Sequence, residues 1–242
     1  FFSYFIRTFA ILLAFFIFLF SLIAILSILN NLNSNNFVLV NGENNSQNSI
    51  VVIKLNGPII DDSLNFIGFQ HSNTINPKMI SDYLNEISLK KPKVIIFRIN
   101  SPGGTVSATN KIYNIIDDFK NKNDVEIIFY TDNLLTSGGY WIALSGDSII
   151  ANYGSIIGSI GVSSPQWIFF NEPISISTGY FGEKIDTNKG IEIFSQNAGK
   201  SKDLFNPFRR PSKEELNHLS KLTNNIYKDF ITTVSKIRKI EK

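Results

Sequence analysis

The chain opens with a long apolar run that contains no charged residue. The run covers residues 8–29 and reads TFAILLAFFIFLFSLIAILSIL. At about 1.5 Å of rise per residue, a helix of this length crosses a hydrocarbon core of about 30 Å. The run is longer than the core of a cleaved signal peptide and ends without a small-x-small cleavage site, so we expect an uncleaved transmembrane anchor.

Charges around this run predict its orientation. Arg7 precedes it, and Glu43 is the only charged residue between the run and Lys54. Because positive charge favours the cytoplasmic side, we expect a cytoplasmic stub at residues 1–7 and a single-pass protein of the cell membrane whose bulk is extracytoplasmic. Residues 30–49 are rich in Asn and Ser and lack apolar periodicity, which predicts a flexible linker off the membrane.

Residues 50–242 show the alternation of patterns expected of one α/β domain. Short apolar runs, typical of strands, alternate with segments in which apolar residues recur at helical spacing. The predicted strands are 50–53, 94–99, 125–130 and 148–151, and the predicted helices are 79–89, 107–119, a short one ending at 144, and a long one from 211 to about 238. This order predicts parallel strands joined by crossover helices. Ser212 and Glu215 form a candidate capping box at the start of the last helix.

Composition excludes several classes of function. The net charge is only +3, and no basic stripe is interleaved with aromatic residues, so nucleic acid is not an expected partner. The chain has no cysteine, which excludes disulfides, cysteine nucleophiles and thiolate metal sites. No metal and no cofactor is predicted.

Two glycine-containing turns follow predicted strands and could carry chemistry. Ser101-Pro102-Gly103-Gly104 ends the second strand, and Thr136-Ser137-Gly138-Gly139-Tyr140 follows the third. Each turn alone is also consistent with an ordinary strand-to-helix connection, with Ser137 as a plain helix cap. Together they predict a serine nucleophile at Ser137 and two backbone amides, of Gly104 and Gly138, that bind an oxyanion.

A serine nucleophile needs a base, and the usual histidine is not well placed. Neither His71 nor His218 has the expected spacing from Ser137, so we predict a lysine base. A lysine serves only when desolvation lowers its pKa toward neutrality, and the neighbouring Asp203 would act in the opposite direction on a lysine beside it. Residue chemistry alone leaves four downstream candidates: Lys184, Lys189, Lys200 and Lys202.

Ser159, in Gly158-Ser159-Ile160-Gly161-Val162, lies among small and apolar residues. If buried, its hydroxyl needs a hydrogen-bond partner, for which a neutral lysine amine is suitable, although a tight turn could satisfy it with backbone instead.

Four motifs in order resemble the signal peptide peptidase A (protease IV) family of membrane-anchored serine proteases, in its short single-domain type. They are Ser-Pro-Gly-Gly, Thr-Ser-Gly-Gly-Tyr, Gly-Ser-Ile-Gly-Val, and Gly-Lys-Ser-Lys-Asp with Asn206-Pro207-Phe208-Arg209, within residues 50–230. The resemblance implies a fold of the Clp protease and crotonase type and a peptidase that works through an acyl-enzyme.

The resemblance also implies roles for individual residues. It makes Ser137 the nucleophile and Lys202, the second lysine of its motif, the general base. It makes Ser159 the hydroxyl that orients the lysine, and Gly104 and Gly138 the oxyanion amides. The implied substrates are remnant signal peptides and other apolar membrane-proximal peptides, and the implied assembly is a homo-oligomeric ring in which neighbouring subunits share active sites.

Two departures from the family pattern stand out. The family has an aromatic residue between the two lysines, whereas this chain has Ser201. The stretch 167–194 is also longer than usual, which could reshape the substrate groove or the subunit contacts. Two alternative functions remain open: a related membrane protease that cuts one partner, such as a stomatin-like protein, and a non-catalytic membrane scaffold. Residues that could line a groove or belong to the core are Phe66, Ile67, Phe69, Trp141 and Trp167.

Overall fold

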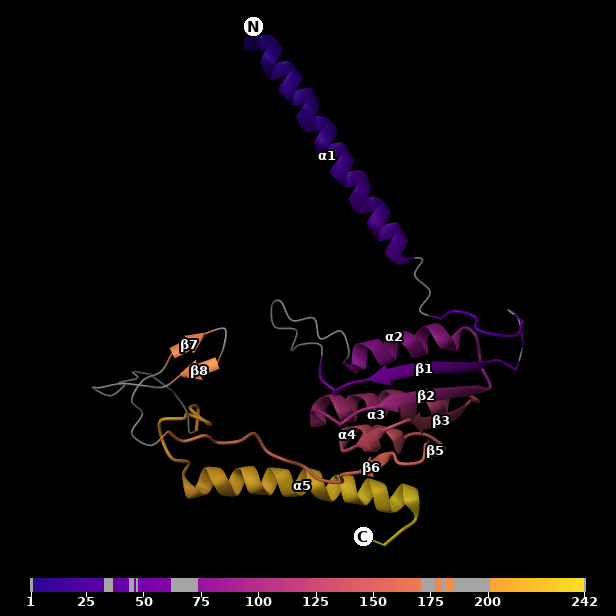
Figure 1. Ribbon diagram of the computed structural model, residues 1–242, viewed down its shortest axis with the longest axis vertical. Helices are drawn as coiled ribbons and strands as arrows, with labels where there is room; N and C mark the ends of the chain where they lie inside the picture. Colours follow the sequence, from indigo (N-terminus) through magenta and orange to yellow (C-terminus); the bar gives the residue numbers. More distant parts are fainter. Residues whose placement is uncertain are drawn as a thin grey trace. The chain divides into compact units, whose positions relative to one another are not determined.

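The computed structural model describes residues 2–32, 37–43, 46, 48–61, 74–170, 177–179, 182–184 and 201–241. The chain divides into two compact units, Phe1–Gln47 and Asn48–Lys242 (Figure 1). In the first unit, helix α1 spans Phe2–Leu32, so it begins earlier and ends later than the predicted run 8–29. Its stretch Phe2–Ile25 is long and apolar enough to cross a membrane.

The second unit is built on a four-stranded parallel sheet. Its strands are β1 (Ile50–Asn56), β2 (Val94–Asn100), β3 (Glu126–Thr131) and β5 (Ser148–Ala151), in the order β1-β2-β3-β5. Helix α2 (Pro77–Ser88) connects β1 to β2, and helix α3 (Val106–Lys122) connects β2 to β3. The predicted α/β fold of parallel strands and crossover helices is confirmed.

One face of this sheet forms the core. Ile53, Phe97 and Phe129 are in register across three strands and fully buried, and the two phenylalanine rings stack at 5.0 Å. The side chains at alternate positions of β1 lie on the opposite face, where Ile50 is 61% and Val52 is 49% exposed. The strand predicted as buried throughout is therefore buried on one face only.

A second, smaller sheet was not predicted. β4 (Leu134–Thr136) pairs in parallel with β6 (Ile156–Gly158), and a bridge between Ser101 and Leu135 attaches β4 to the end of β2. Each strand has only three residues, too few for a periodic pattern to be recognised. Two further short strands, β7 (Ser177–Gly179) and β8 (Gly182–Lys184), form an antiparallel pair.

Two helices complete the unit. The short α4 (Gly138–Ala143) is entirely buried, and the long α5 (Lys213–Arg238) runs past it, yellow in Figure 1. The predicted capping box is confirmed, because Ser212 and Glu215 each bond the other's backbone N–H. The Trp141 and Phe230 rings stack at 4.4 Å and join α4 to α5.

Candidate active site around Ser137

Ser137 lies at the sharp turn between β4 and α4 and has a strained backbone. Its φ of 51° and ψ of −122° fall in a region that L-residues rarely adopt. Such a conformation costs about 1–3 kcal/mol and persists only where the surroundings enforce it. Here the Ser137 N–H donates to the Gly158 carbonyl at 2.7 Å, and the Ser137 carbonyl accepts from Trp141 N–H at 3.0 Å. The Ser137 side chain makes no capping bond to α4, so its hydroxyl is available for chemistry.

The end of β2 holds β4, and with it the Ser137 turn, in place. Ser101 N–H donates to Leu134 O at 2.8 Å, and Thr136 N–H donates to Ser101 O at 3.1 Å. The Asn100 side-chain oxygen accepts from the backbone N–H of Asn133 at 3.0 Å, and from other groups of the connection between β3 and β4. The predicted Ser-Pro-Gly-Gly turn is therefore built directly into the support of the predicted nucleophile.

Gly103 approaches the Ser137 turn, and Gly104 approaches the Ile59 backbone, more closely than any other residue type allows. Gly103 has a φ of +97°, and a Cβ on it would lie 2.7 Å from the Cβ of Ser137 and 2.8 Å from the amide nitrogen of Gly138. A Cβ on Gly104 would lie 1.9 Å from the Ile59 carbonyl oxygen. Both positions therefore require glycine.

The amides of Gly104 and Gly138 face the same space. A parallel β-bridge pairs Ile59 with Gly104. In it, Ile59 N–H donates to Gly103 O and Ile59 O accepts from Thr105 N–H, so the bridge uses neither polar group of Gly104. The nitrogen of Gly104 lies 3.3 Å from the point that a Cβ on Gly138 would occupy. Within the described parts of the chain, neither amide N–H donates a hydrogen bond. Two free donors beside a serine hydroxyl can stabilise an oxyanion.

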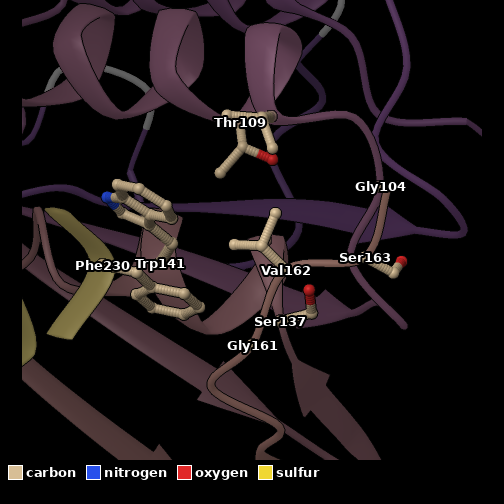
Figure 2. A pocket seen from close by; sticks show the side chains of 10 residues that line it. Gly104, Thr109, Ser137, Trp141, Gly161, Val162, Ser163 and Phe230 are labelled. Carbon is tan, nitrogen blue, oxygen red and sulfur yellow. The ribbon is translucent and has the colours of Figure 1, made fainter. Parts of the chain in front are cut away.

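A pocket of about 100 Å³ opens beside these groups (Figure 2). One end is polar, with the Ser137 hydroxyl, and the other is apolar, with the rings of Trp141 and Phe230 (Figure 2). Gly104 and Gly138 also line the pocket. The residues that line it are Gly104, Val106, Thr109, Ser137, Gly138, Trp141, Gly161, Val162, Ser163 and Phe230. Trp141, predicted as either a groove residue or a core residue, is only 8% exposed and lines this pocket.

Thr109 is a pocket residue that the sequence reasoning missed. It is 1% exposed, and its hydroxyl has no hydrogen-bond partner within the described residues. A signal was present: Thr109 precedes Ile112 by three residues and Ile116 by seven, so it occupies the apolar stripe of α3. A polar residue at a core-facing position of an amphipathic helix indicates a partner or a ligand.

Ser159 lies next to the turn but is not buried. It follows Gly158, whose carbonyl accepts from Ser137 N–H, and it has a left-handed φ of 51°. Its side chain is exposed in the single chain, so the enclosed setting considered from the sequence is not found there.

Lys202 is exposed and is not part of the pocket lining. It belongs to a turn that an ionic cluster fixes to the start of α5. Arg209 donates to both carboxylate oxygens of Asp203, at 2.6 and 2.8 Å, and to both of Glu215, at 2.9 and 2.7 Å. Hydrogen bonds from Arg209 hold the pKa of both carboxyl groups well below their usual range. Arg209 is shared between Asp203 and Glu215, so this cluster of one guanidinium and two carboxylates carries one net negative charge beside Lys202.

The aromatic side of the same cluster is Trp167, whose indole packs on Phe205 with ring centroids 5.3 Å apart. The Arg209 guanidinium lies 5.1 Å from the Trp167 ring, and the indole N–H donates to Asn206 O at 3.1 Å. Trp167 therefore anchors the Lys202 turn and does not line the Ser137 pocket.

Helix α5 separates the Lys202 turn from the Ser137 pocket. Arg209 ties the turn to Glu215 in the first turn of α5, whereas Phe230, in the same helix, lines the pocket. Fifteen residues of α-helix between these positions span about 22 Å at about 1.5 Å per residue. A hydrogen bond between Ser137 and Lys202 requires about 3 Å, and within the described residues Lys202 neither lines the pocket nor bonds Ser137.

Other expected features fall outside the described residues. These are Lys189, Lys200, His71, the side chain of Lys184, the groove candidates Phe66, Ile67 and Phe69, and most of the longer stretch 167–194. Over the residues that the structure describes, no group of three or more His, Asp or Glu side chains could hold a metal ion.

The profile of Peptidase family S49 matches residues 120–242. The chain is 34% identical over 146 residues to a Methanocaldococcus jannaschii protein provisionally named a protease, a match that covers 60% of this chain and 42% of that protein. It is 27% identical over 201 residues to an Enterococcus faecium protein provisionally named a signal peptide peptidase SppA, covering 82% and 54% respectively.

Among solved structures, a mutant of the 1510-N membrane-bound stomatin-specific protease matches with a TM-score of 0.37 and 19% identity, over 52% of this chain and 53% of that one. The chain thus spans about half or less of the length of the curated relatives it matches. The family profile covers more than half of the chain, including the Ser137 turn, α4 and α5, and the chain therefore belongs to peptidase family S49.

Proposed function

We propose that this protein is a membrane-anchored serine endopeptidase in which Ser137 is the nucleophile and Lys202 the general base. The observation that carries the proposal is the strained turn at Ser137, whose uncapped hydroxyl shares a pocket with the amides of Gly104 and Gly138, which donate no hydrogen bond within the described residues. Strain of this kind is maintained where function requires it, and an oxyanion donor contributes about 3 kcal/mol to the transition state.

In the proposed reaction, neutral Lys202 takes the proton of Ser137 as Oγ forms a bond to the substrate carbonyl carbon. The carbonyl oxygen becomes an oxyanion and accepts hydrogen bonds from the Gly104 and Gly138 amides. The C–N bond then breaks, the leaving amine takes the proton from Lys202, and an acyl-enzyme remains. A water molecule, deprotonated by Lys202, attacks this ester; the ester C–O bond then breaks, Lys202 returns the proton to Ser137 Oγ, and the acid is released.

The base comes from a second copy of the chain in this proposal. The distance along α5 between the Lys202 turn and the pocket argues against a dyad within one chain. A neighbouring copy in a ring could insert its Lys202 beside Ser137 and Ser159, and this contact would also enclose the exposed amine. Lysine acts as a base only when such burial favours its neutral form.

The proposed substrates are apolar peptides, such as signal peptide remnants, at the extracytoplasmic face of the cell membrane. Helix α1 is a candidate anchor, and one end of the pocket is apolar, which suits peptides that leave a bilayer. A single-pass anchor with the peptidase unit outside the cytoplasm would hold the site near such substrates.

The test uses the full chain in detergent with a quenched fluorescent signal peptide and a fluorophosphonate probe. Ser137→Ala and Lys202→Ala should each lower kcat/KM by at least about 100-fold, the range of a general base, while Lys200→Ala retains most activity. Mixing the Ser137→Ala and Lys202→Ala chains should restore part of the activity, because mixed oligomers contain complete sites.

Full activity in Lys202→Ala would refute the base, and no recovery on mixing would refute its supply by a neighbour. Cleavage of a stomatin-like peptide with none of the signal peptide would reassign the substrate. A folded wild-type chain that neither cleaves peptides nor labels at Ser137 would instead support a scaffold.

A further inference from the structure

The Thr109 hydroxyl is a buried polar group that has no partner among the residues that the structure describes. Thr109 is 1% exposed, and its Oγ1 makes no hydrogen bond within the described part of the chain. Its own helix offers an acceptor, the Thr105 carbonyl, which accepts from the Thr109 backbone N–H at 3.0 Å but not from the Thr109 hydroxyl, unlike the i−4 carbonyls that Thr232 and Thr233 bond in α5. Native structures rarely leave a buried hydroxyl unpaired, and such exceptions need an explanation.

The direction of this hydroxyl supplies the explanation. Thr109 lines the Ser137 pocket, and Figure 2 shows its oxygen directed into the same space as the Ser137 hydroxyl. Its Oγ1 lies 2.4 Å from the point that a Cβ on Gly138 would occupy. The glycine at 138 therefore leaves room beside this buried hydroxyl, and an alanine there would collide with it.

The position of the pocket identifies what would meet the hydroxyl. In the proposed reaction the attacked carbonyl carbon sits on Ser137 with its oxygen toward Gly104 and Gly138. The side chain of that same substrate residue must then enter the adjoining space between Thr109 and the apolar walls, Val162 and Trp141. A pocket of about 100 Å³ suits a small side chain.

We propose that Thr109 is a specificity-determining residue that hydrogen-bonds the hydroxyl of a serine or threonine at the substrate position just before the cut bond. This inference rests on the proposed function. The hydroxyl of such a side chain would meet Thr109, while the methyl group of threonine would pack against the apolar wall. Apolar side chains of the same size would also fit but would leave the Thr109 hydroxyl unpaired, which disfavours them.

The test is a cycle of two matched substitutions in the full chain and in the peptide. Two peptides differ only in threonine or valine before the cut bond, which have nearly the same shape, and the chain carries Thr109 or Thr109→Val. Wild type should cleave the threonine peptide with a kcat/KM about 3- to 10-fold above that of the valine peptide, the effect of one net hydrogen bond. In Thr109→Val this ratio should fall to 1 or below.

Two further variants make the result specific. Thr109→Ser retains the hydroxyl and should retain the threonine preference, and Thr232→Val makes the same chemical change on an exposed part of α5 and should alter nothing. Fluorophosphonate labelling counts active sites in each preparation, so poorly folded protein does not enter the ratio.

The outcomes separate this inference from the proposed function. Cleavage of both peptides that depends on Ser137, with a ratio that Thr109→Val leaves unchanged, would overturn the role of Thr109 alone. An equal fall for both peptides would also overturn it, because it would place Thr109 in a step common to all substrates. Peptide cleavage that persists in Ser137→Ala, or none by wild type, would remove the proposed function and this inference with it.

Discussion

Substitution of Gly103 by alanine tests the packing that supports Ser137. Gly103 has a φ of +97°, and a Cβ there would lie 2.7 Å from the Ser137 Cβ and 2.8 Å from the Gly138 nitrogen. One of these two atoms belongs to the backbone, so a side-chain rotation does not relieve the collision. Gly154 is the matched control, because it has a φ of +82° and a Cβ on it would meet no atom within 4 Å.

The structure gives the size of the expected effect. Both alanines impose an unfavourable backbone conformation, which costs about 1–3 kcal/mol of stability. Only Gly103→Ala must also move Ser137 away, from 2.7 Å to an ordinary contact of at least 3.4 Å, a shift of about 0.7 Å. Because a displacement of about 1 Å in a catalytic group can cost about 100-fold in rate, we expect kcat/KM to fall about 10- to 100-fold.

The assay combines three measurements on the full chain in detergent. Thermal unfolding should show a loss for both variants, larger for Gly103→Ala because of its collision, whereas fluorophosphonate labelling and peptide cleavage by folded protein should be impaired only in Gly103→Ala. If Gly103→Ala labels and cleaves as fast as Gly154→Ala, the close approach of the two turns does not position Ser137, and the reasoning is wrong.

Three further predictions concern the surroundings of the site. Phe230→Ala should lower the free energy of unfolding by about 3–5 kcal/mol in urea denaturation, because Phe230 is 1% exposed, whereas Leu222→Ala, on the exposed side of α5, should change it little. Ser101→Ala should cost about 1–3 kcal/mol in the same assay, because its buried hydroxyl bonds two backbone groups; a neutral effect would contradict this. Arg209 lowers the pKa of Glu215 in the folded state, so wild type should lose stability as pH falls below about 4.3, the ordinary pKa of glutamate. Arg209→Met should be less stable at neutral pH and lose less on acidification, as measured by Tm; equal acid losses would count against the cluster.

The sequence predicts those parts of the fold whose pattern is long enough to be periodic. Strand β2, helix α3 with Ile112 and Ile116, and the capping box at Ser212 all follow from apolar spacing and capping chemistry. The strands β4 and β6 do not, because three residues beside glycine turns carry no period. The exposed face of β1 does not follow either, since an unbroken apolar run does not reveal which face is covered.

The candidate site likewise has parts that the sequence predicts and parts that only the structure reveals. The glycines at 103, 104 and 138 are predictable because turns with close backbone approach need them. The separation of about 22 Å along α5 runs from Glu215, which holds the Lys202 turn, to Phe230, which lines the pocket. It depends on tertiary packing, because nothing in the local sequence places Phe230 against Trp141. Thr109 lay within reach of sequence reasoning, as a polar residue on an apolar stripe, but only the structure shows that its hydroxyl lacks a partner within the described residues.

The contacts at the two ends of helix α5 limit the insertions and deletions that this protein tolerates. Glu215 is fixed to Arg209 near its first turn, and Phe230 is fixed against Trp141 fifteen residues later. Removing or adding one residue between them would rotate Phe230 by about 100° around the helix axis and take it off the tryptophan. We therefore expect natural variants to accept many substitutions on the exposed side of α5, while insertions and deletions between residues 215 and 230 are eliminated by selection.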